Sequence, residues 1–130
     1  QASDERFKKN INPIHNAVDK IEQLNGVSYE FKSDEFPEKQ FTDGRQIGLI
    51  AQDVEKVLPE LVKTDSEGYK SVAYQNMVAV LIEAVKEQQS EINNLKKEIE
   101  GLKNNQRADV SLTTPTAEWL GVKTKWNINI

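Results

Sequence analysis

The chain lacks cysteine and holds a single histidine, His15, among its 130 residues. Without cysteine it has no disulfide bond, no thiolate ligand for a metal and no cysteine nucleophile. One histidine excludes a metal site built from several histidines, and any Ser-His-Asp triad would have to use His15. We interpret His15 as a structural or surface residue, so catalysis here would have to rest on other side chains.

Long apolar stretches and basic stretches are both absent. The longest apolar stretch, Met77 to Ile82, is far shorter than the ~20 residues of a membrane-spanning helix. Lys and Arg number 17 against 21 Asp and Glu, which gives a net charge of −4. An acidic chain without a basic stretch is a poor partner for nucleic acid. The first ten residues are mostly polar, so we expect no signal peptide. From the short apolar stretch and the acidic charge we expect neither a membrane partner nor a nucleic-acid partner.

Apolar residues are scarce as well, at 37% of the chain, whereas soluble domains run nearer ~45–50%. The length suits one domain. We therefore expect a partner to complete part of its apolar surface. Phosphate-binding and dinucleotide-binding motifs are missing, since Gly44 and Gly48 are too isolated to cradle a phosphate. No metal and no organic cofactor is expected.

Three zones follow one another along the chain, and together they predict an α+β fold. Residues 1–75 mix short apolar patterns with turn signals and predict a small globular unit. Residues 76–104 are nearly free of helix breakers and predict one long C-terminal helix. Residues 105–130 predict an extended tail with strand-like alternation near its end.

The first zone is expected to hold short helices and short strands. Its first helix is predicted to begin at Asn12-Pro13, because asparagine suits the N-cap and proline suits the first helical position. Asn25-Gly26 supplies the end of that helix. The predicted helices cover 13–24 and 53–58, and the predicted strands cover 27–31, 46–51 and 69–73.

The long helix carries four successive heptads, which predict a coiled coil. Glu91 and Glu98 at position g are complementary to Lys96 and Lys103 at position e of the following heptad, and this favours parallel chains. Position d holds one polar residue, Gln88. The residues at positions a and d are Val78, Leu81, Val85, Gln88, Ile92, Leu95, Ile99 and Leu102.

The heptads leave the number of helices open. β-branched residues at a with leucine at d favour a dimer. Before Val85 the apolar face is wider, which fits a larger bundle or packing against the globular zone. A helix folded back on its own domain is a third alternative, although the chain has no second long helix to pair with it. The residues that widen the face are Ala79, Val80, Ile82 and Ala84.

Four blocks occur in an order and spacing that resemble one known family. They are Ser3 to Ile11; Ala17 to Ile21 with Leu24-Asn25-Gly26 and the strand Val27 to Phe31; Gly48 to Glu55 with Leu58 to Val62; and Tyr69 to Tyr74. The family is peptidase S74, the intramolecular chaperone domains that end phage tailspikes, tail fibres, endosialidases and neck appendage proteins. The resemblance covers residues 3–100.

The resemblance implies a chaperone that assembles as a homotrimer and helps to fold the fibre region preceding it in the same polypeptide. It implies autoproteolysis between Ala2 and Ser3, with Ser3 as nucleophile and Lys8 as base. It also changes the expected coiled coil from a dimer to a parallel trimer with three-fold symmetry. The expected place is a virion tail or appendage precursor, assembled in the host cytoplasm and released on maturation.

The spacing of Ser3 and Lys8 sets a condition on this chemistry. Residues five apart lie about 140° apart on an α-helix and on opposite sides of a strand. The two side chains can therefore meet only if the segment bends, or if they come from different chains. A lysine accepts a proton only when it is neutral, which burial or a nearby cation such as Arg6 or Lys9 favours.

Two alternatives compete with this interpretation. One is a trimerisation module that does not cleave. The other is a receptor-binding fibre tip, in which Trp119 and Trp126 form the binding face. Asp34 and Glu35 are interpreted as a solvated face, and Tyr69 and Tyr74 as packing residues.

Overall fold

The computed structural model describes residues 2–112, with side chains described as far as residue 109. The chain divides into two compact units, residues 1–89 and residues 90–130. The first unit holds every strand and short helix described below, and it ends within the long helix. Trp119, Trp126 and the strand-like part of the predicted tail lie outside the described residues.

The described part of the chain is α+β, as the sequence predicted, with short strands followed by a long helix. The helices are η1 (Glu5–Phe7), α1 (Ala17–Glu22), η2 (Pro37–Lys39), α2 (Ala51–Val57), η3 (Pro59–Leu61) and α3 (Tyr74–Leu112), where η marks a 3₁₀ turn. The strands are β1 (Val27–Tyr29), β2 (Gln46–Gly48), β3 (Val62–Thr64) and β4 (Lys70–Val72).

The strands form two separate antiparallel pairs. β1 pairs with β2, with Val27 opposite Gly48, and β3 pairs with β4, with Val62 opposite Val72. The sequence predicted β1, β2 and β4, each slightly longer than observed, but it missed β3. β3 begins directly after η3 and has three residues, so it is too short for an alternation pattern to reveal it.

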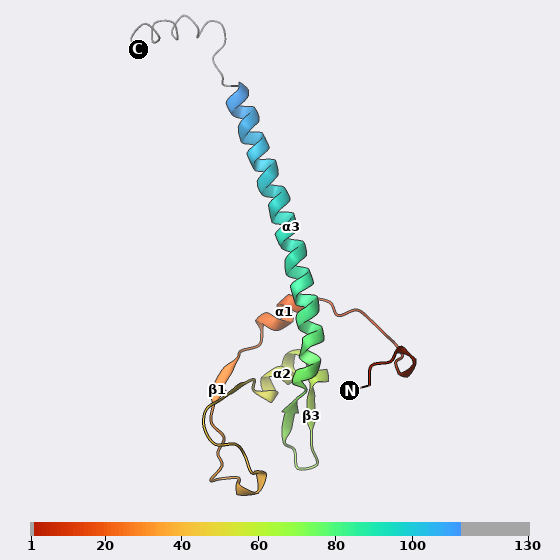
Figure 1. Ribbon diagram of the computed structural model, residues 1–130, viewed down its shortest axis with the longest axis vertical. Coiled ribbons are helices and arrows are strands. Elements are labelled where there is room, and N and C mark those ends of the chain that lie inside the picture. The colour runs from red at the N-terminus through yellow and green to blue at the C-terminus, as the bar shows by residue number, and fades with distance from the viewer. Residues whose placement is uncertain (1, 113–130) are drawn as a thin grey trace, which may run out of the picture. The chain divides into compact units, whose positions relative to one another are not determined.

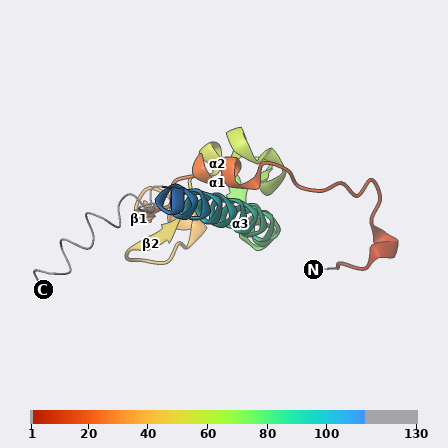
Figure 2. The ribbon, with the colours of Figure 1, turned by 90° about the horizontal axis from the view of Figure 1, so that it is seen from above.

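The core of the first unit lies where α1, α2, η3 and the first turns of α3 meet. In Figure 2, α1 and α2 lie along one side of the first turns of α3. The core is small, which agrees with the low apolar content of the chain. Its buried side chains are Ala17, Val54, Leu58, Leu61, Met77, Val80 and Ala84.

Helix α3 is longer than predicted, because it covers 39 residues from Tyr74 to Leu112. Residues 105–112 are therefore helical, and the prediction of an extended tail from residue 105 is wrong for them. The reason is local: Gln106, Arg107 and Ala108 favour helix, and no proline occurs between the start of α3 and Pro115.

Helix α1 is shorter than predicted, because it begins at Ala17 and not at Pro13. Asn16 has a left-handed backbone (φ 54°), which separates the Pro13 region from the helix. His15 therefore lies before α1, and its expected place inside the first helix is wrong. The N-cap signal at Asn12-Pro13 was a local one, and tertiary contacts to α1 override it.

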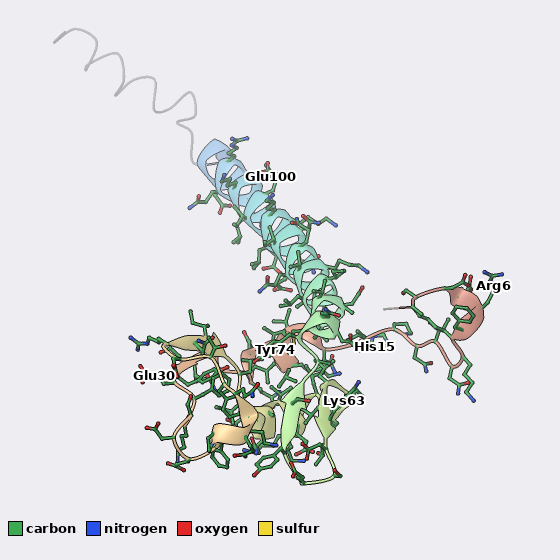
Figure 3. All side chains as sticks on the ribbon, turned by 60° about the horizontal axis from the view of Figure 1, so that its bottom comes forward. Arg6, His15, Glu30, Lys63, Tyr74 and Glu100 are labelled. Carbon is green, nitrogen blue, oxygen red and sulfur yellow. The ribbon has the colours of Figure 1, made fainter. Side chains whose placement is uncertain are left out.

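Gly48 lies against the hydroxyl group of Tyr74. Tyr74, labelled in Figure 3, is the first residue of α3. The backbone N–H of Leu49 donates a hydrogen bond to Tyr74 Oη over 2.8 Å. A Cβ atom on Gly48 would lie 2.6 Å from Tyr74 Oη and 3.3 Å from a ring carbon of Tyr29. Only glycine therefore leaves room for this contact between β2 and α3.

We expect Gly48→Ala to lower the free energy of unfolding by about 1–2 kcal/mol, because the methyl group displaces Tyr74 Oη from Leu49. The test is a double-mutant cycle with Tyr74→Phe, measured by urea denaturation. Tyr74→Phe removes the oxygen that clashes, so Gly48→Ala should cost less in that background. Strictly additive effects would show that the crowding is not at Tyr74.

Candidate functional site

The first residues form an arm that stands apart from the core. Residues 2–13 are all exposed. Within the described part of the chain, the hydrogen bonds of residues 3–12 join partners inside the arm. In Figures 1 and 2 the arm runs away from α1 and ends in the small turn η1. Phe7 and Ile11 are 75% and 67% exposed on it, so the arm carries apolar side chains that this single chain leaves uncovered.

The turn of the arm brings Ser3 and Lys8 together. Lys8 Nζ donates a hydrogen bond to Ser3 Oγ over 2.9 Å. The sequence required either a bend or two chains for this contact, and within one chain the bend supplies it. η1 is one 3₁₀ turn, closed by the Lys8 N–H bonding to the Glu5 carbonyl at 2.9 Å. The same contact, with the proton on Oγ and a neutral amine, would be the contact of a serine with its base.

Asp4 closes the same turn from its start. Its Oδ1 accepts the backbone N–H of Arg6 at 2.9 Å, as an N-cap side chain does. The Arg6 guanidinium returns to the same carboxylate, with Nε 3.0 Å from Oδ1 and Nη2 2.7 Å from Oδ2. The Arg6 side chain, followed by its backbone N–H, lowers the pKa of Asp4. Arg6 was expected to act on Lys8, but its hydrogen bonds in the arm go to Asp4.

The apolar heptad positions in α3 are exposed in both units. Val78, Leu81 and Val85 in the first unit are 44–62% exposed. In the second unit the heptad side chains Ile92, Leu95, Ile99 and Leu102 are 45–67% exposed. Exposed apolar residues repeating at a and d are typical of a surface that binds other helices.

Part of the wider apolar face before Val85 packs against the first unit itself. Val80 and Ala84 are buried in the core of the first unit, which agrees with packing against the globular zone. Ile82 is 54% exposed. The beginning of α3 therefore has two apolar faces, one covered by its own unit and one uncovered.

Glu87 of α3 holds the beginning of α1, a contact that no local sequence signal predicts. Glu87 Oε1 accepts the backbone N–H of Ala17 at 2.9 Å, and Oε2 accepts that of Val18 at 3.0 Å. Asn16 makes no side-chain cap of its own. The N–H groups of Val18 and Ala17 lower the pKa of Glu87, with a smaller contribution from His15. A residue about 70 positions away thus does the work of a helix cap.

We expect Glu87→Gln to lower Tm by about 5 °C at neutral pH, because the amide keeps only one acceptor for the two N–H groups. Since the pKa of Glu87 is lowered in the folded state, its carboxylate stabilises the fold above the ordinary glutamate pKa. That stabilisation is lost as the pH falls through the lowered value. The difference in Tm between wild type and Glu87→Gln should therefore be large at pH 7 and small below about pH 4, as melting curves at the two pH values would measure.

Glu83→Gln is the matched control for Glu87→Gln. Glu83 lies on the same helix and pairs with Lys86 at the surface, 2.9 Å away, so its loss should change Tm very little. Equal changes in Tm for the two variants would contradict the role of Glu87.

An aromatic groove is the second feature that the sequence did not reveal. Its volume is about 700 Å³ and it lies between the 31–41 segment and the β3–β4 pair. Phe31 stacks on Phe41 with centroids 4.3 Å apart, and Tyr69 packs edge-on against Phe36. Lys39 lies over the Tyr69 ring and pairs with Glu67, which raises the pKa of Lys39.

Comparison with known proteins matches the arm, β1, β2 and the helices between the arm and β3 to one family. Residues 3–63 match the model of peptidase family S74, described as chaperone of endosialidase. This match contains Ser3 and Lys8, whereas α3 lies after it. Among the helices of the described residues, none combines the length and apolarity needed to cross a membrane.

Long tail fibre proteins of phages are similar over a larger part of the chain. Long tail fiber protein Gp37 of Enterobacteria phage K3 is 38% identical over 105 residues, which are 75% of this chain and 8% of that protein. Its namesake in Salmonella phage S16 is 39% identical over 112 residues, 79% of this chain and 14% of that protein. The chain thus spans a small part of the length of these relatives. Over residues 3–63 the chain belongs to the chaperone-of-endosialidase family, peptidase family S74.

Proposed function

We propose that this chain is the trimer-forming intramolecular chaperone of a phage tail fibre, and that it releases itself by cutting the bond between Ala2 and Ser3. The observation that carries the proposal is the hydrogen bond of 2.9 Å between Lys8 Nζ and Ser3 Oγ, inside the segment that matches the family. The similarity to long tail fibre proteins supports a fibre region as the part of the polypeptide that the chaperone helps to fold. The expected place is a phage tail component.

The proposed cleavage needs only groups that the arm contains, and water. Neutral Lys8 removes the proton from Ser3 Oγ, and Oγ forms a bond to the carbonyl carbon of Ala2. The C–N bond to Ser3 then breaks, and the Ser3 nitrogen takes the proton from Lys8. The result is an ester that joins the Ala2 carbonyl to Ser3 Oγ. Water hydrolyses that ester, which leaves a carboxylate on Ala2 and restores the Ser3 hydroxyl.

We propose further that assembly turns this chemistry on. In the single chain the arm is exposed, and an exposed lysine is well solvated in its charged form. Burial against a neighbouring chain would favour the neutral amine that the reaction needs. Phe7 and Ile11 supply uncovered apolar surface on the same arm.

The exposed heptad residues support the trimer. Their apolar side chains need cover, and the charges at g and e are complementary in parallel chains. A parallel homotrimer would bring three copies of the preceding fibre region to one end in register. That alignment lowers the entropy that three separate fibre chains would lose on association, which is how the domain would act as a chaperone.

The test uses a chain that carries fibre sequence upstream of Ala2. Mass spectrometry should find a product that begins at Ser3, and analytical ultracentrifugation should find three copies in the released domain. A chain that forms trimers and never splits would support the non-cleaving module instead. A monomeric form that splits as fast as the trimer would contradict the coupling of cleavage to assembly.

A further inference from the structure

The bend that joins Ser3 to Lys8 rests on very little backbone structure. η1 has three residues, and the backbone hydrogen bonds that close it are Phe7 N–H to the Asp4 carbonyl at 3.1 Å and Lys8 N–H to the Glu5 carbonyl at 2.9 Å. A single exposed 3₁₀ turn is marginal in water, because nucleating a turn fixes several dihedral angles for few hydrogen bonds. Something besides the backbone has to hold it closed.

The carboxylate of Asp4 is the group in the right place. Oδ1 receives two donors from Arg6, the backbone N–H at 2.9 Å and Nε at 3.0 Å. Oδ2 receives Nη2 at 2.7 Å. Three hydrogen bonds therefore tie Asp4 at the start of the turn to Arg6 at its centre (Figure 3 labels Arg6 on the arm). Lys8 follows directly after η1, so its direction depends on whether the turn is closed.

We infer that Asp4 is a positioning residue, which holds the η1 turn closed so that Lys8 reaches Ser3. This inference rests on the proposed self-cleavage for its effect on rate. Asp4 does not take up or release a proton in the reaction. It sets the fraction of time for which the amine of Lys8 lies within hydrogen-bond distance of the serine, and the rate of cleavage scales with that fraction.

The structure separates two parts of the Asp4 contact. The backbone N–H of Arg6 needs only an acceptor at Oδ1, whereas the guanidinium needs both carboxylate oxygens. Asp4→Asn keeps one carbonyl oxygen that can accept the Arg6 N–H. Arg6→Ala keeps the backbone N–H and loses the guanidinium. Asp4→Ala loses both parts.

The experiment measures the single-turnover rate of self-cleavage against pH in the chain with upstream fibre sequence. We expect Asp4→Ala to lower the plateau rate at least tenfold, and Asp4→Asn and Arg6→Ala to lower it less. The midpoint of the pH–rate profile should stay where it is in wild type, because Asp4 changes how often Lys8 reaches Ser3. Asp34→Ala, which removes a carboxylate from an exposed loop, is the matched control and should cleave at the wild-type rate.

A second measurement does not depend on cleavage. In the 130-residue chain, nuclear Overhauser contacts between the side chains of Ser3 and Lys8 should be present in wild type and lost in Asp4→Ala. If wild type fails to cleave but these contacts are lost in Asp4→Ala, the proposed function fails while the positioning role of Asp4 stands. If Ser3→Ala abolishes cleavage and Asp4→Ala cleaves at the wild-type rate, the inference is overturned and the function stands. A shifted midpoint with an unchanged plateau, or loss of the trimer in Asp4→Ala, would also overturn it.

Discussion

Ser3→Ala is expected to leave a chain with upstream fibre sequence uncut. The Ser3 hydroxyl is the group that would attack the Ala2 carbonyl, so its loss should lower the rate at least about 10⁴-fold. Ser3 and Lys8 are exposed on an arm outside the core. The variant should therefore fold and assemble as wild type does. Denaturing electrophoresis over several days and mass spectrometry of the product measure the loss.

Lys8→Arg tests the base separately from the positive charge. Arginine keeps the charge and can donate to Ser3 Oγ, but it stays protonated and cannot accept the proton of the hydroxyl. We expect cleavage to fall nearly as far as in Ser3→Ala. Lys9→Arg is the matched control, because the hydrogen bond to Ser3 Oγ comes from Lys8 and not from Lys9. Cleavage of Ser3→Ala at the same bond, or normal cleavage by Lys8→Arg, would rule out the dyad.

Leu95→Asp is expected to abolish the proposed trimer. Leu95 is a heptad d residue, and its side chain is 47% exposed in the single chain, so the substitution leaves the core of the first unit intact. In a three-fold coiled coil it would place three carboxylates in one apolar layer. Each chain would lose about 3 kcal/mol of apolar packing, besides the cost of burying its charge. The association constant should fall more than a thousandfold.

Sedimentation equilibrium at micromolar concentration measures this loss, with Ser90→Asp as the matched control. Ser90 lies on the same exposed helix at heptad position f. Its replacement by aspartate therefore adds the same charge outside the a and d positions that are predicted to form the helix contact. Leu95→Asp should be monomeric and Ser90→Asp trimeric. If both remain trimeric, the trimer does not depend on the heptads. If the proposed coupling to assembly is right, Leu95→Asp should also cleave more slowly.

Much of the fold could be predicted because its signals are local. The long helix followed from a repeat that needs no tertiary contact to be visible, and β1, β2 and β4 followed from short apolar alternations next to turn residues. The end of α3 was predicted too early, at residue 104 instead of 112. The polar composition of residues 105–112 favours a tail, but a polar segment that contains good helix formers also continues a helix well.

The geometry of the candidate site could be predicted in part. Ser3 and Lys8 came from the resemblance of the first block, and the spacing argument required the bend that η1 supplies. The argument could not show which residue closes that bend. Asp4 and Arg6 are two positions apart, and only the backbone turn brings the Arg6 N–H and guanidinium onto one carboxylate. The aromatic groove was missed because it brings Phe31 and Phe41, in the connection between β1 and β2, next to Tyr69, in the connection between β3 and β4.

The sequence alone determined that no cysteine or multi-histidine chemistry occurs, that a long heptad helix follows a small α+β unit, and that Ser3 and Lys8 are the candidates for a serine and its base. Only the tertiary structure decided that Glu87 caps α1 from far along the chain. It also decided that Val80 and Ala84 face the core while Val78 and Val85 remain exposed. The physical reason is the same in both cases: periodicity shows which face of a helix is apolar, whereas the partner that covers that face, or caps its end, comes from residues distant in sequence.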